Sequence, residues 1–149
     1  MFGYRRWHNN LLMNKNKLRE TEPLLQVILD AIDEKQGRDL ISIDLSHLGH
    51  AIADYFVICH GDSVPQVGAI ANFVEEQVAR KLDLKILRRQ GFENSQWVLL
   101  VFENVVVHIF LKEYRDYYKL EDLWADGVLI NYAEAGNMPL PSKKKKLLE

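Results

Sequence analysis

The chain has 149 residues, of which 48% are hydrophobic and 27% charged, and this composition predicts one globular domain with its own core. The single cysteine, Cys59, excludes an internal disulfide and favours a reducing compartment such as the cytoplasm, and no apolar run reaches the length of a membrane-spanning helix. The formal net charge of −2 hides an uneven distribution, because residues 20–130 hold 19 acidic and 10 basic side chains while both ends are basic. An acidic body repels phosphate and attracts a basic partner, although acidic surfaces also serve solubility alone.

The two ends of the chain differ from its middle. Residues 1–19 are rich in Arg and Lys, contain no acid and show no hydrophobic periodicity, so we predict a disordered basic extension there. The segment lacks the serines and the amphipathic face of an organellar transit peptide, which favours an extension or an upstream start. Residues 20–132 form the predicted domain, and residues 133–149, with four consecutive lysines, form a predicted flexible tail.

The first half of the domain alternates between helical and extended patterns. Apolar residues at helical spacing from Leu24 to Ile32, followed by Gly37, predict the first helix. A strand is predicted over residues 40–45. The unbroken apolar run of residues 55–59 predicts a central strand that is buried on both faces.

The pattern after the central strand is again helical. Ser63 and Gln66 have the spacing of a capping box, and apolar residues from 67 to 78 repeat at helical intervals. A short strand over residues 84–87 and a loop over residues 91–95 are predicted next.

Residues 97–110 contain the clearest pattern in the chain. Two β-branched apolar segments flank Glu103-Asn104, which predicts a β-hairpin with a two-residue turn. If the turn is type I′, Glu103 has a positive φ, and its replacement by glycine should stabilise the turn by about 1 kcal/mol. A helix is predicted over residues 113–124, and residues 128–130 form a short apolar segment that can pack back.

These elements predict an α/β fold, a mixed β-sheet with flanking helices. The junction Gly61-Asp62-Ser63 between a strand and a helix resembles the Gly-Ser loop of nucleotidyltransferases, where backbone N–H groups meet phosphate. That chemistry needs paired carboxylates on the next strand to hold two Mg²⁺ ions. Residues 84–89 offer three cations and no carboxylate, which favours a helix N-cap over a catalytic loop.

The histidines give no pattern typical of a metal site. We interpret His47, His50 and His60 as surface residues and Cys59 as a small buried hydrophobe. His108 follows three valines, and two interpretations stay open: an interface residue or a hydrogen-bonded core histidine. We predict no metal, no cofactor and no catalytic residue.

Aromatic residues gather in the hairpin and in the helix after it. Some belong to the core, but Tyr and Trp also dominate the energetics of protein interfaces, and an acidic rim around them favours a basic protein partner. The candidate partner-binding residues are Trp97, His108, Tyr117, Tyr118, Glu121, Asp122, Trp124 and Asp126.

Four blocks of the sequence resemble one family, the ribosomal silencing factors, also called the Iojap-like family. The blocks are residues 35–39, residues 53–59 with Gly61 and Ser63, residues 66–67 with 69–71, and the hairpin through Trp124. The resemblance covers about residues 22–130.

The resemblance implies a nucleotidyltransferase-like fold without catalytic activity. It also implies a translation repressor that binds a basic protein of the large ribosomal subunit at the subunit interface and sterically blocks joining of the small subunit. RNA contact would be incidental, and no membrane is involved. A nucleotidyltransferase-fold enzyme or nucleotide-binding protein is the alternative, and a homodimeric scaffold stays open.

The chain departs from the family pattern at the hairpin. The family usually has Asp-Tyr-Gly-Asp where this chain has Val101-Phe102-Glu103-Asn104, and the usual acid before Gly91 is here Gln90. If those carboxylates contact the ribosome, docking is expected to be weaker or differently arranged.

Overall fold

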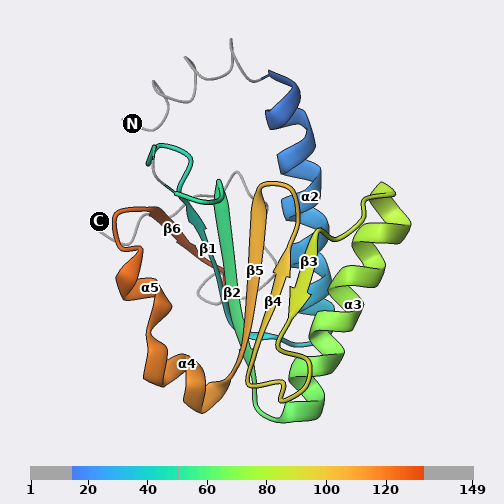
Figure 1. Cartoon of the computed structure of the whole chain (residues 1–149), viewed down its shortest axis with the longest axis vertical. Helices are drawn as coiled ribbons and strands as arrows, with labels where there is room; N and C mark the ends of the chain where they lie inside the picture. Colours follow the sequence, from blue (N-terminus) through green and yellow to red (C-terminus); the bar gives the residue numbers. More distant parts are fainter. Residues whose placement is uncertain (1–14, 50, 133–149) are drawn as a thin grey trace.

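The computed structural model describes residues 15–49 and 51–132 (Figure 1). The first helix among the described residues begins at Lys15, so the last five residues of the predicted disordered extension are helical. The predictions for residues 1–14 and for the tail at 133–149 lie outside the described residues.

Within the described residues, six strands form one sheet in the order β3-β4-β5-β2-β1-β6. Only β2 and β5 pair in parallel among these strands, and the other neighbours are antiparallel, so the predicted mixed sheet is confirmed. The strands are β1 (Arg38–Asp44), β2 (Tyr55–Gly61), β3 (Arg88–Gln90), β4 (Trp97–Val101), β5 (Val105–Leu111) and β6 (Val128–Asn131).

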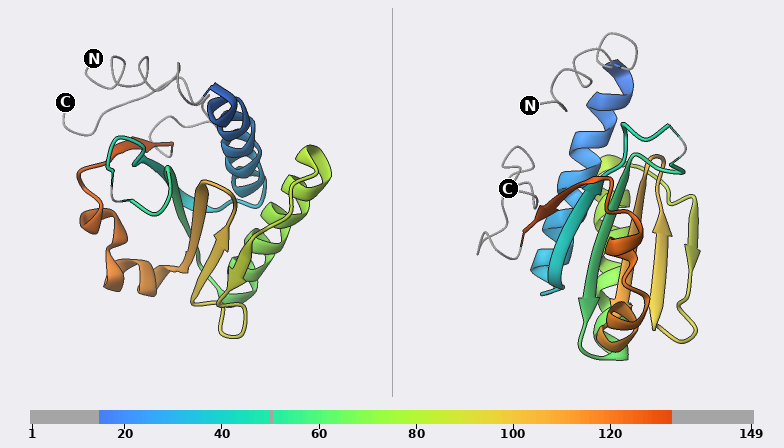
Figure 2. Two further views of the ribbon diagram at one scale, coloured as in Figure 1. Left: turned by 45° about the horizontal axis from the view of Figure 1, so that its top comes forward. Right: turned by 90° about the vertical axis from the view of Figure 1, so that its left-hand side faces the viewer.

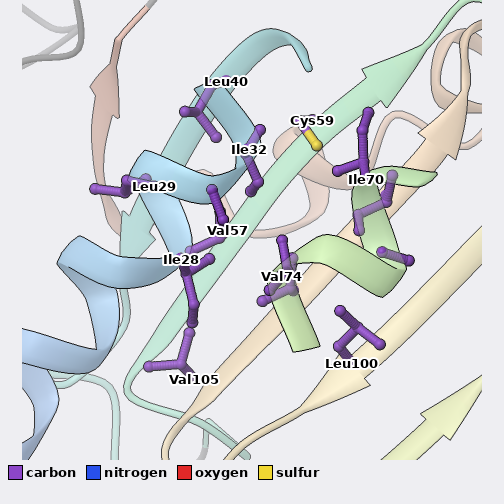
Figure 3. Packing of buried hydrophobic residues seen from close by; sticks show 14 of the residues in the cluster. Ile28, Leu29, Ile32, Leu40, Val57, Cys59, Ile70, Val74, Leu100 and Val105 are labelled. Carbon is purple, nitrogen blue, oxygen red and sulfur yellow. The ribbon is translucent and has the colours of Figure 1, made fainter. Parts of the chain in front are cut away.

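Helices cover both faces of the sheet, but unequally. The long helices α2 (Lys15–Glu34) and α3 (Val64–Leu82) lie together on one face, and the short helices α4 (Lys112–Tyr118) and α5 (Leu120–Leu123) lie on the other (Figure 2). On the first face, Ile28 and Ile32 of α2 and Ile70 and Val74 of α3 belong to one cluster with Val57 of β2 (Figure 3). This is the larger of the two hydrophobic clusters among the described residues.

The predicted central strand is confirmed, because β2 is fully buried after its first residue. Cys59 within it is buried as expected, and desolvation raises the pKa of its thiol to about 12. At the start of α3, the Ser63 hydroxyl accepts a hydrogen bond from the Gln66 N–H at 3.2 Å. The Gln66 side chain in turn accepts from the N–H of Asp62 at 2.8 Å, one residue before the position of a standard capping box.

Two predicted elements are misplaced. The strand predicted at 84–87 is wrong: β3 begins at Arg88, while Leu84 and Ile86 pack against the core without forming a strand. The predicted helix over 113–124 is broken at Lys119, whose φ of 49° is left-handed and separates α4 from α5.

The hairpin and the position of its turn are confirmed, but the turn is not of type I′. β4 and β5 pair with Val101 opposite Val106, and the Phe102 N–H donates to the Val105 carbonyl at 2.9 Å. Neither Glu103 nor Asn104 has a positive φ, so the turn is not type I′. The expectation that glycine at position 103 relieves strain therefore falls.

The segment at 128–130 packs back as β6, an edge strand. It pairs antiparallel with β1, and the Ser42 and Tyr132 hydroxyls lie 3.0 Å apart beside that pairing. This edge is farthest from β3 in the sheet.

Candidate functional site

The second face of the sheet is half-open along β4. Val98 and Leu100 point to the helix-covered face and are fully buried, whereas Trp97, Leu99 and Val101 alternate with them and are only partly buried. Beyond β4, the β3 residues Arg88 and Gln90 pair opposite Val101 and Leu99 and thus share the same face. We call Trp97, Leu99 and Val101 the open strip.

At the Trp97 end of this strip, four aromatic side chains form a row from the core to the solvent. We call this row, Phe110–Trp97–Tyr118–Tyr117, the aromatic ladder. Trp97 stacks on Phe110 with ring centroids 4.8 Å apart, and Tyr118 packs on Trp97 at 4.9 Å. Tyr117 meets Tyr118 edge-on at 5.0 Å. Phe110 is fully buried, while Tyr118 is 49% and Tyr117 77% exposed. The rings of Tyr117 and Tyr118 are therefore exposed to solvent, while the ladder is anchored in the core through Phe110.

His108 lies beneath Trp97 and is buried, so the structure shows the core interpretation and not an exposed interface residue. Its Nδ1 accepts a hydrogen bond from the indole N–H of Trp97 at 3.2 Å, which places the proton of the neutral ring on Nε2. Nε2 has no partner among the described residues. Desolvation lowers the pKa of His108 to about 3, and the ring stays neutral under Trp97.

Arg115 fixes the corner between α4 and α5 to the sheet. Its guanidinium makes two contacts with the Glu121 carboxylate, at 3.1 and 3.0 Å, and Nη1 donates to the Arg38 carbonyl at 3.2 Å and to His60 Nδ1 at 3.0 Å. Arg115 is buried and Glu121 partly so. We call these contacts the Arg115 clamp. It holds the helix that carries Tyr117 and Tyr118.

The prediction that His60 is a surface residue is wrong, because the clamp covers it and leaves only 4% of it exposed. Burial and then the neighbouring Arg115 charge lower the pKa of His60. Because arginine can only donate, Nδ1 of His60 must be the acceptor.

The remaining predicted residues differ in burial. Trp124 is partly buried and packs edge-on against Phe56 at 5.4 Å, and Glu121 is held by the clamp. Asp122 and Asp126 are exposed, and no cation in the described part of the chain forms an ion pair with either. The structure thus gathers Trp97, Tyr117 and Tyr118, leaves the two aspartates on the neighbouring surface, and turns the other three residues inward.

Sequence reasoning missed Leu99, Val101 and the clamp. The strand Trp97–Val101 is apolar on both faces, and a strand with a covered second face looks the same in sequence as one with a half-open face. The clamp joins residues 38, 60, 115 and 121, and this long-range grouping leaves no local pattern.

The Gly61-Asp62-Ser63 junction is occupied by structural contacts. Ser63 caps α3, and the Asp62 carboxylate accepts from the Arg38 guanidinium at 2.9 Å. The strand that follows, β3, is Arg88-Arg89-Gln90 and carries no carboxylate. No group of three or more His, Cys, Asp or Glu side chains within the described ranges is placed to hold a metal ion. The structure thus gives this junction the cap role.

None of the described helices has both the length and the apolar character needed to cross a membrane.

The fold and its half-open face define a small α/β domain with a mixed sheet, two long helices on one side and an aromatic surface on the other. The family follows from the sequence: residues 18–147 match the family described as ribosomal silencing factor during starvation, and the chain belongs to that family. Membership places the protein in translation regulation and confirms the family prediction.

Individual relatives agree with this assignment. The chain is 41% identical over 105 residues to the ribosomal silencing factor of Halalkalibacterium halodurans, covering 70% of this chain and 88% of that protein. It is 40% identical over 106 residues to the Bacillus subtilis ribosomal silencing factor, covering 71% and 88%. A crystal structure of a Chromobacterium violaceum protein superposes with a TM-score of 0.66 at 33% identity, covering 70% of this chain and 85% of that one. The likeness to nucleotidyltransferases stays a prediction.

Proposed function

We propose that this protein is a cytoplasmic translation repressor, without enzymatic activity, that binds the large ribosomal subunit and sterically blocks joining of the small subunit. The observation that carries the proposal is the aromatic ladder beside the open strip in a member of the ribosomal silencing family. The partner is a basic ribosomal protein at the subunit interface.

The ladder has the chemistry of an interface centre. Tyr and Trp bury large areas and lose little conformational entropy, and they recur as the residues that contribute most to binding. Trp97 is already fixed by Phe110 and His108, so docking does not have to order it. Leu99 and Val101 add partly exposed apolar area along the same strand.

The charges beside the ladder suit a basic partner. Asp122 and Asp126 are exposed, and neither forms an ion pair with a cation of the described residues, so both remain available to attract positive charge. Exposed charges of this kind mainly accelerate association and lose their effect as salt rises.

A subunit-joining assay tests the proposal directly. Purified large and small subunits are mixed with and without the protein, and formation of joined ribosomes is followed by light scattering. The proposal expects joining to fall in a dose-dependent way that requires binding to the large subunit. Unchanged joining at protein concentrations that saturate the large subunit would refute the steric mechanism.

The same assay separates the homodimer alternative. If two copies paired through the ladder, repression would rise less steeply than the total protein concentration in the dimer range, because pairing covers the docking face and leaves only the monomer free to bind. A monomer that represses in proportion to its bound fraction supports the proposed docking.

A further inference from the structure

A second surface, at the opposite edge of the sheet from α5, has the charge opposite to that of the rest of the molecule. Between residues 22 and 132 the chain has ten Lys and Arg residues, and five of them fall within residues 80–89, against one acid, Asp83. The other described surface is acidic by comparison. This segment runs from the end of α3 into the edge strand β3, away from α4 and α5 (Figure 1).

Four of these cations are exposed and unpaired: Arg80, Lys81, Lys85 and Arg88. No described carboxylate forms an ion pair with any of them. The fifth, Arg89, is also exposed but has partners, because it pairs with Glu75 at 3.1 Å, contacts Asn72 and lies over the Phe92 ring. We call the four unpaired cations the basic corner.

A structural role explains only part of the basic corner. Arg80 and Lys81 lie in the last turn of α3, where cations offset the partial negative charge at the C-terminal end of a helix. Lys85 and Arg88 lie beyond the helix and have no such role. Lys85 points outward between Leu84 and Ile86, which pack against the core.

The basic corner reaches the proposed docking face at Arg88. Arg88 pairs opposite Val101, so its side chain lies on the same face of the sheet as the open strip. When a partner binds to that strip, the ribosomal groups next to the partner therefore come close to Arg88. The exposed Leu87 directly precedes Arg88 in the chain.

We propose that the basic corner binds the phosphate backbone of ribosomal RNA next to the protein on which the open strip docks. This inference rests on the proposed function, since the large subunit surface is largely RNA. An acidic body approaching that surface is repelled by phosphate, and a local cluster of unpaired cations offsets the repulsion where the two surfaces meet. Contacts to phosphate position a protein without reading sequence, so the corner fixes the orientation of docking.

Arg88 and Arg89 form a matched pair for the test. The two are adjacent and chemically identical, but Arg88 is unpaired on the docking face and Arg89 is ion-paired on the other. Binding of wild type, Arg88→Gln and Arg89→Gln to purified large subunits is measured by sedimentation at several salt concentrations. Circular dichroism checks that each variant is folded.

We expect Arg88→Gln to lower the slope of log affinity against log salt by about 1, and Lys81→Gln/Lys85→Gln/Arg88→Gln to lower it by about 3. Between about 50 and 200 mM salt, the ratio of the wild-type affinity to the Arg88→Gln affinity should fall by roughly threefold. Arg89→Gln should keep the wild-type slope. Equal slopes for wild type and Arg88→Gln would overturn the inference while leaving the proposed function intact, and failure of the wild type to bind would instead refute the proposed function.

A cross-link distinguishes RNA from an acidic protein as the partner. A photo-reactive amino acid replaces Leu87, which is 64% exposed within the segment that carries the basic corner. Cross-linking to ribosomal RNA on the bound large subunit supports the inference. Cross-linking to ribosomal protein alone would overturn it.

Discussion

Trp97 is the residue at which the core of this protein meets its surface. Its indole N–H is satisfied by His108, one ring face is held by Phe110, and Tyr118 packs on it from the solvent side. The indole N–H, which would otherwise need a water molecule, is thus hydrogen-bonded within the protein, and the exposed part of the Trp97 ring is apolar. This arrangement depends on His108 staying neutral.

The pH dependence of stability tests the neutral state of His108. Because burial lowers its pKa from 6.5 to about 3, the unfolded chain takes up a proton below about pH 6.5 while the folded protein does not. The stability that comes from burying neutral His108 is therefore fully present above pH 6.5 and is lost as the pH falls toward 3. Between pH 7 and pH 5 the free energy of unfolding should fall by about 2 kcal/mol through this group.

His108→Gln should remove that part of the loss, since glutamine keeps an acceptor for Trp97 and does not titrate. Urea unfolding of both proteins at the two pH values measures the difference. The same pH-dependent loss in wild type and variant would show that His108 is protonated in the folded state or that another group is responsible.

Arg115 is the second residue whose removal should be costly. Arg115→Leu leaves the Glu121 carboxylate, the Arg38 carbonyl and His60 without their donor, and we expect a loss of about 2–4 kcal/mol in unfolding free energy. Lys112→Ala is the matched control in the same helix, because it removes only the exposed ion pair with Asp116 and should leave stability within experimental error. Chemical denaturation of both variants decides; equal effects would mean that the clamp contributes no more than a surface pair.

At the scale of elements, the junction between β2 and α3 has a structural role. Its serine caps the helix and its aspartate pairs with Arg38, and the following strand brings no carboxylate. We therefore predict no nucleotidyl transfer in the presence of Mg²⁺ and nucleoside triphosphates, measured with radiolabelled substrate. Transfer that Ser63→Ala abolishes would contradict this.

The hairpin turn gives a second test at this scale. Asn104 anchors the turn to the start of β2, because its carbonyl accepts from the N–H groups of Asp54 and Tyr55 at 2.9 and 3.1 Å. Glu103 is exposed and has an ordinary backbone conformation. Glu103→Gly should therefore lower stability by about 0.5–1 kcal/mol through the greater freedom of the unfolded chain. Thermal unfolding of this variant measures the change in stability, with Glu103→Ala, which we expect to be near neutral, as the control. A stabilised glycine variant would mean that the turn has another conformation in solution.

Elements with strong local patterns were predictable from sequence. The apolar run of β2, the capping Ser63 and the two β-branched segments of the hairpin each indicated their structure. β3 was misplaced because an exposed three-residue edge strand has no apolar alternation, and its position is set by pairing with β4. The break at Lys119 has neither glycine nor proline to mark it, since the left-handed residue is a lysine.

The candidate site was only partly predictable. We predicted Trp97, Tyr117 and Tyr118 as partner-binding residues from residue type; the structure places their rings in one ladder, and their role in binding stays a prediction. The inward positions of His108 and Glu121 follow from partners on other elements, Trp97 and Arg115, which the spacing of residues along the chain does not reveal.

At the scale of the whole molecule, the two faces of the sheet serve different ends. The face under α2 and α3 contains the larger core, and the other face is covered at β1, β2 and β5 but half-open at β4. The half-open face carries the aromatic ladder, has exposed aspartates to one side, and is joined by the basic corner at Arg88 on the other side. A single docking event could then engage a basic protein and RNA on adjacent parts of one surface.

We propose that the ladder, together with the exposed Asp122 and Asp126, docks on the large subunit. Pelleting with purified large subunits compares wild type with Trp97→Ala, Asp122→Lys and Asp126→Lys, each checked for folding by circular dichroism. Trp97→Ala also risks a loss of about 3–5 kcal/mol in stability, so the exposed aspartates are the cleaner probes. Asp33→Lys, an exposed reversal on α2 and away from the docking face, is the matched control.

We expect each folded docking-face variant to bind at least about tenfold more weakly, Asp33→Lys to bind like wild type, and deletion of residues 136–149 to change binding little. Docking through the ladder is contradicted if the folded aspartate variants bind like wild type while the tail deletion abolishes binding, because docking would then depend on the lysine-rich tail.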